Sequence, residues 1–95
     1  PEERGNKIGK LLGMRGAADK INELLDKGVV LQPRYGAQGV LAAAIDSRHT
    51  KLIDYCITNK VGLNEAGLYR ETPLMKAIDK NNIALAKRLL AAGAR

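Results

Sequence analysis

Phenylalanine and tryptophan are both absent from this chain of 95 residues, and aromatic residues make up only 3% of it. A hydrophobic core must therefore come from leucine, isoleucine, valine and alanine. Such side chains suit a thin stack of closely packed helices better than a large globular interior. With this length the chain forms one domain at most, and its core is marginal in size.

Cysteine and histidine occur once each. A single cysteine excludes an internal disulfide, and nothing indicates an oxidising compartment. His49 and Cys56 are seven residues apart and could share a helix face, but Cys56 falls at an apolar position, where cysteine acts as a small hydrophobic residue. No carboxylates cluster beside them, so a metal site lacks ligands. No glycine-rich phosphate loop follows a strand. We therefore expect a protein that is not an enzyme and binds no cofactor or metal.

Long apolar segments are also missing, because no run approaches the ~20 residues that a membrane span needs. No signal peptide is visible. The chain starts at Pro1 without a methionine and stops at Arg95, which suggests a piece of a longer chain. We expect an intracellular protein, cytoplasmic or nuclear, with a secreted effector as the alternative.

Positive charge is in excess, with a formal net charge of +6. The lysines and arginines are spread along the whole chain instead of forming a single stripe. A scattered basic surface raises association rates with acidic partners, whereas a nucleic-acid reader usually clusters its charges. The balance favours an acidic protein partner and leaves nucleic acid as the alternative.

An internal repeat is the most informative feature that is present. Ala44-Ile45-Asp46 matches Ala77-Ile78-Asp79, which begins 33 positions later in the chain. The same offset places Leu41 under Leu74, Leu52 under Leu85, and Cys56-Ile57 under Leu89-Leu90. The first third fits less well: Ile8, Leu11 and Leu12 keep the offset, but Ile21, Leu24 and Leu25 match the third repeat one residue out of step.

With its T-P-L-x-x-A motif at residues 72–77 and L-L-x-x-G-A at 89–94, this 33-residue period resembles the ankyrin repeat. The resemblance is clearest in the third repeat and degenerate in the first. It implies an all-α, ankyrin-repeat-like solenoid of helix–turn–helix pairs with short β-hairpin fingers. The expected repeats span roughly residues 5–37, 38–70 and 71–95 of one domain, 1–95.

Helix punctuation agrees with the repeat. Thr72 suits an N-cap, Pro73 suits the first helical position, and Gly93 suits the left-handed residue after a helix. Gly39 replaces the capping threonine in the second repeat, and Lys60 stands where Gly93 stands in the third, so that helix end should be less well terminated. We expect apolar stripes facing inward on the second helices, including Leu85, Ala86, Leu89 and Leu90.

Ankyrin-like chains usually bind partners through their fingers and the exposed side of each first helix. Here the fingers are residues 29–38 (the first finger) and 61–71 (the second finger). Tyrosine and arginine are enriched among interface hot spots, and each finger contains a Tyr–Arg neighbour pair. The resemblance implies these partner-binding candidates: Arg34, Tyr35, Gln38, Asp46, Leu68, Tyr69, Arg70, Lys76, Asp79 and Lys80.

The expected function is therefore a non-catalytic protein–protein interaction module that docks a partner through its fingertips and concave helix face. The alternatives are a basic nucleic-acid-binding surface, a targeting module of a larger, effector-type protein, and a purely structural spacer between domains. Because the third repeat lacks a C-terminal neighbour in this sequence, end-to-end self-association is also expected.

Overall fold

The computed structural model describes residues 10–11, 17–35, 38–67 and 69–95. They form a mostly helical structure with one small two-stranded sheet. Five helices have defined bounds: α2 (Ala18–Asp26), α3 (Val40–Ser47), α4 (Thr50–Thr58), α5 (Pro73–Asp79) and α6 (Ile83–Ala92). The first helix, expected around Ile8, Leu11 and Leu12, lies largely outside the described residues.

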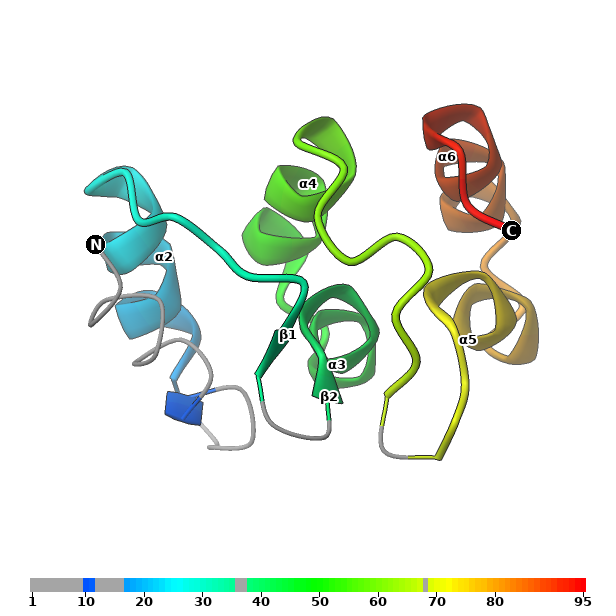
Figure 1. The fold of residues 1–95 in the computed structure, drawn as a ribbon, viewed down its shortest axis with the longest axis horizontal. Helices are drawn as coiled ribbons and strands as arrows, with labels where there is room; N and C mark the ends of the chain where they lie inside the picture. The colour runs from blue at the N-terminus through cyan, green and yellow to red at the C-terminus, as the bar shows by residue number, and fades with distance from the viewer. Residues whose placement is uncertain (1–9, 12–16, 36–37, 68) are drawn as a thin grey trace.

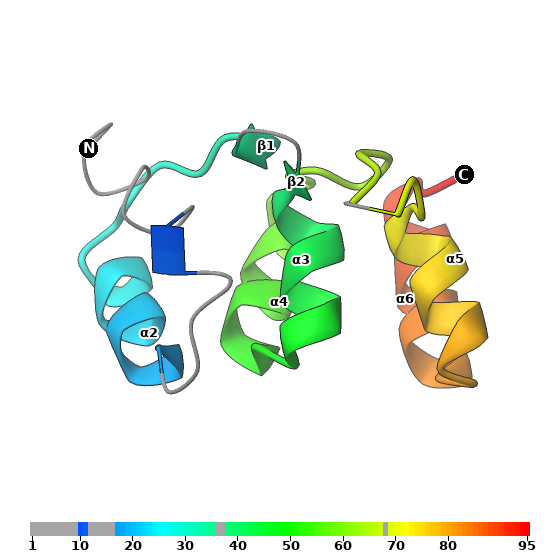
Figure 2. The same cartoon turned by 90° about the horizontal axis from the view of Figure 1, so that it is seen from below.

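The helices are arranged in two rows (Figure 1). One row contains α2, α4 and α6, and the other contains α3 and α5. Seen from below, the helices run side by side, with the short turns of each pair at one end and the long connecting segments at the other (Figure 2). The core lies between the rows, where Ile21, Leu41, Leu52 and Leu89 are fully buried.

The 33-residue spacing persists in the backbone. Helices α3 and α5 begin at residues 40 and 73, and α4 and α6 begin at residues 50 and 83, so both starts differ by 33. The turns repeat as well: His49 N donates to Ala44 O at 3.0 Å, and Asn82 N donates to Ala77 O at 2.9 Å. Each pair of helices is therefore built by the same local hydrogen bonds.

Capping follows the sequence expectation. The Thr72 side chain accepts a hydrogen bond from Met75 N, and Pro73 occupies the first turn of α5. Gly39 precedes α3 in an extended conformation and provides no side-chain cap. At the end of α6, Gly93 adopts a left-handed conformation with φ 109°.

The end of α4 differs from expectation. Lys60 takes the left-handed conformation of Gly93, with φ 56°. Val61 N then donates to Cys56 O at 2.8 Å, just as Ala94 N donates to Leu89 O at 2.9 Å. The helix is therefore terminated as completely as α6, but a side chain occupies a position that favours glycine.

One apolar position departs from the expected inward stripes. Leu90 is exposed, whereas Leu85, Ala86 and Leu89 are buried as expected, and Ile78 on α5 is exposed as well. Among the described residues, no segment lies beyond the last helix pair on the side away from α3 and α4 (Figure 1).

Sheet structure is confined to the first finger within the described part of the chain. Strand β1 (Arg34–Tyr35) pairs antiparallel with β2 (Gln38–Gly39). The described residues of the second finger form turns and irregular backbone, without a strand. The expectation of a hairpin in both fingers is therefore correct for the first and wrong for the described part of the second.

Candidate functional site

The two fingers are joined into one surface. Gly39 N donates to Ala66 O at 3.0 Å, and Arg34 Nη1 donates to Ala66 O at 3.0 Å and to Glu65 Oε2 at 3.2 Å. Glycine is required at position 39, because an added Cβ would lie 2.4 Å from Glu65 O. The Arg34 guanidinium therefore holds the fingers together as well as lying at their surface.

Tyr35 is more buried than a partner-binding residue should be. Its ring is half-buried and packs against the hydrophobic core, and its hydroxyl accepts a hydrogen bond from Gln32 N at 3.1 Å. Burial raises the pKa of Tyr35, while the Gln32 hydrogen bond acts in the opposite direction. Tyr35 thus stabilises the first finger, and the neighbouring Gln38 is likewise half-buried in β2.

Tyr69 is the most exposed large hydrophobic side chain among the described residues, at 77% exposure. The turn that carries it is defined by its backbone: Gly67 N donates to Glu71 O at 2.9 Å, and Arg70 N donates to Gly67 O at 3.1 Å. Arg70 is exposed and adopts φ 59°. Leu68, the third candidate here, lies outside the described residues.

Lys76 was expected on an exposed helix face, but the structure shows that it is buried. Its side chain is only 3% exposed, and Nζ lies 2.7 Å from Asp46 Oδ2 and 4.0 Å from Glu71 Oε1. Because a buried ammonium needs a nearby carboxylate, this lysine joins α5 to α3 and is shielded from solvent. Its long aliphatic stem also fills space between the two helices.

Around Lys76 lies a row of charged side chains from α3, α5 and the second finger. Lys80 Nζ is 3.9 Å from Asp46 Oδ1. A side-chain hydrogen bond with Asp79 raises the pKa of Glu71, and the Lys76 charge opposes that shift. Asp46, Asp79 and Lys80 are exposed as expected, and their contacts with Lys76 and Glu71 link them into one charged row.

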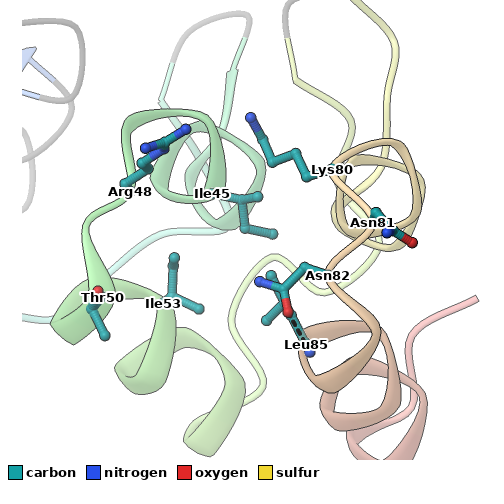
Figure 3. A pocket seen from close by; sticks show the side chains of 8 residues that line it. All are labelled: Ile45, Arg48, Thr50, Ile53, Lys80, Asn81, Asn82 and Leu85. Carbon is teal, nitrogen blue, oxygen red and sulfur yellow. Dashed lines mark hydrogen bonds between the residues drawn. The ribbon is translucent and has the colours of Figure 1, made fainter.

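A second surface feature was not anticipated from the sequence. A groove of about 430 Å³ separates the two helix pairs at their turn ends (Figure 3). Its lining combines polar and apolar side chains. It is lined by Ile45, Arg48, Thr50, Ile53, Lys80, Asn81, Asn82 and Leu85. The sequence feature that could have indicated this groove is the repeated turn. Arg48 and Asn81 occupy equivalent positions in successive repeats, and both have a left-handed backbone.

The cysteine and histidine lack the surroundings of a catalytic pair. Cys56 is fully buried, and burial raises its pKa to about 12, which disfavours the nucleophilic thiolate. His49 is buried at the start of α4, where burial lowers its pKa. Within the described residues, no group of three or more histidine, cysteine, aspartate or glutamate side chains could hold a metal ion.

Comparison with known proteins found no matching family model, no matching curated protein and no matching solved structure. None of the helices in the described part of the chain is long and apolar enough to cross a membrane.

Proposed function

We propose that this chain is a non-catalytic, ankyrin-type repeat module that binds a protein partner through the second finger and the adjoining face of α3 and α5. The observation that carries the proposal is the exposure of Tyr69, whose ring is 77% accessible at the tip of a hydrogen-bonded turn. An aromatic ring there contributes nothing to the core. It would gain free energy by being covered.

The ankyrin-type assignment rests on the repeated spacing of elements within the chain itself. Two helix pairs follow each other with the 33-residue period, with equivalent turns and helix ends, and long connections emerge at one end. A repeat motif, T-P-L-x-x-A, coincides with the capped start of α5. Proteins built of stacked repeats use such extended surfaces for binding.

Recognition would combine one aromatic anchor with a pre-arranged polar surround. Ion pairs between α3 and α5 fix the charged row, and the Arg34 hydrogen bonds fix the fingers. Little conformational entropy would then be lost on binding, apart from the ordering of Tyr69 and Arg70. The cationic Arg70, which makes no ion pair with any described residue, and the net positive charge would attract an acidic partner.

Several basic side chains are already neutralised, which supports a protein partner over nucleic acid. Lys51 pairs with Asp26, Arg88 with Asp54, and Lys76 with Asp46. A phosphate backbone would have to compete with these carboxylates for the same cations.

The test is affinity capture from a lysate with and without nuclease, followed by mass spectrometry. The wild-type chain is compared with Tyr69→Ala/Arg70→Ala and with Val30→Ala, a control that trims an exposed apolar side chain away from the second finger. All three should show the same thermal unfolding by circular dichroism. A protein that survives nuclease, persists with the control and disappears with the double variant is the expected result.

Two outcomes would overturn the proposal. Capture that depends on intact nucleic acid and ignores the double variant would identify the basic surface as the functional feature. A captured set that is identical for all three chains would show that the second finger does not bind a partner.

A further inference from the structure

Four large apolar side chains are exposed on the last helix pair. Met75 and Ile78 lie on α5, and Ile83 and Leu90 lie on α6. Their spacings of three and seven residues place each pair on one side of its helix. We call these four residues the end face. Their exposed fractions are 48%, 60%, 56% and 57%.

In the preceding helix pair, α3 and α4, the residues equivalent to three members of the end face are covered by the next pair. The residues 33 positions before Met75, Ile78 and Leu90 are Ala42, Ile45 and Ile57. Those three have exposed fractions of 0%, 3% and 9%, because α5 and α6 pack over them. The end face is thus the same kind of surface without its covering layer.

Charged positions repeat in the same way. Asp46, which accepts the Lys76 ion pair, is the equivalent of Asp79 one repeat earlier. Asp54, which pairs with Arg88 on α6, is likewise the equivalent of Lys87. Asp79 and Lys87 therefore border the end face where the preceding pair makes its cross-layer ion pairs. Asp79 is acidic and Lys87 is basic, so the end faces of two copies can pair opposite charges with each other.

We propose that the end face binds a second copy of this chain, with a two-fold axis running parallel to the helices. This axis places α5 of each copy opposite α6 of the other. Such an interface uses one patch twice, so each contact is made in duplicate. Met75, Ile78 and Leu90 are covered, as their equivalents Ala42, Ile45 and Ile57 are within the chain, and Asp79 of each copy meets Lys87 of the other.

Helix geometry supports this register. The rotation preserves height along the helices, and the turn between α5 and α6 marks a common level. Ile78 and Ile83 both lie close to that turn, so they face each other across the axis. Asp79 borders the turn, whereas Lys87 lies four residues beyond Ile83, or roughly 6 Å at the helical rise. The flexible lysine side chain can span that height to reach Asp79.

The experiment is sedimentation analysis of the full 95-residue chain over a wide range of protein concentrations. The wild-type chain should double its mass as the concentration rises. Ile78→Lys should remain monomeric, because the substitution buries an unpaired charge at the two-fold axis. Val30→Lys, the control at an exposed apolar site elsewhere, should dimerise like the wild type. Thermal unfolding of each variant verifies folding.

Charge reversal tests the register. Asp79→Lys and Lys87→Asp should each remain monomeric, because either change opposes like charges in both copies of the contact. An equimolar mixture of the two variants should form a heterodimer, since both copies of the contact then join a lysine to an aspartate, whereas each homodimer would oppose like charges. Native mass spectrometry distinguishes this heterodimer by its mass.

A wild-type chain that stays monomeric at all concentrations would overturn the proposal. So would a dimer that withstands Ile78→Lys, or a mixture of the charge variants that forms no heterodimer. The inference is independent of the proposed binding function, because Tyr69→Ala/Arg70→Ala should leave the dimer unchanged.

Discussion

The ion pair between Lys76 and Asp46 offers the most decisive test of how α5 is attached to α3. The ammonium is 3% exposed and the carboxylate 46%, with 2.7 Å between Nζ and Oδ2. We consider Asp46→Asn, which keeps the size of the side chain and removes its charge. The lysine would then be left buried, with only the Glu71 carboxylate at 4.0 Å to balance it.

Removing one partner of a fully buried pair typically costs about 3–5 kcal/mol. The cost should be smaller here, because water reaches half of the Asp46 side chain and Glu71 retains part of the attraction. We expect Asp46→Asn to lower the free energy of unfolding by about 2 kcal/mol. Lys76→Met, which removes the buried charge and keeps the aliphatic volume, should change it by less than about 1 kcal/mol.

The assay is urea unfolding followed by circular dichroism at low protein concentration. The matched control is Asp54→Asn, which breaks the exposed ion pair with Arg88. We expect that control to cost under about 0.5 kcal/mol, as exposed pairs usually do. The reasoning is refuted if the Asp46 and Asp54 variants unfold at the same urea concentration, or if Lys76→Met costs more than Asp46→Asn.

Three further predictions concern single positions. Lys60→Gly should raise the free energy of unfolding by about 0.5–1 kcal/mol, because glycine relieves the left-handed backbone; Asn59→Gly, where φ is −97°, should not. Cys56 should react with iodoacetamide only on unfolding, and fast labelling of the native chain would contradict its burial. Burial lowers the pKa of His49 from its ordinary 6.5, so the unfolded chain binds that proton more readily. Stability should be retained above pH 6.5 and decline as pH falls below it. His49→Gln should reduce that decline in urea titrations at several pH values.

Much of the fold follows from the sequence because it is encoded locally. The Thr72 cap and the left-handed Gly93 each depend on residues close together in the chain, and the 33-residue spacing repeats in the sequence itself, so each was predictable. The first finger was placed correctly for the same reason. The left-handed backbone of Lys60 was not expected, because lysine does not favour that conformation even though it aligns with Gly93.

The candidate site was less predictable because it depends on contacts between distant segments. Tyr35 and Tyr69 occupy similar places in their fingers, but only the first has a core to pack against. Lys76 resembled a surface lysine until Asp46, from the preceding helix pair, was placed beside it. Sequence spacing gives the side of a helix on which a residue lies, but it does not say whether a neighbouring helix covers that side.

The position of α3 between two other layers has a consequence for how the chain opens. Its residues 40–45 are all buried, whereas α6 keeps one open flank. Amide protons in α3 should therefore exchange with solvent only when the whole stack separates, while those near the end of α6 can exchange through local fraying. The buried segment at the centre thus reports the cooperativity of the entire stack.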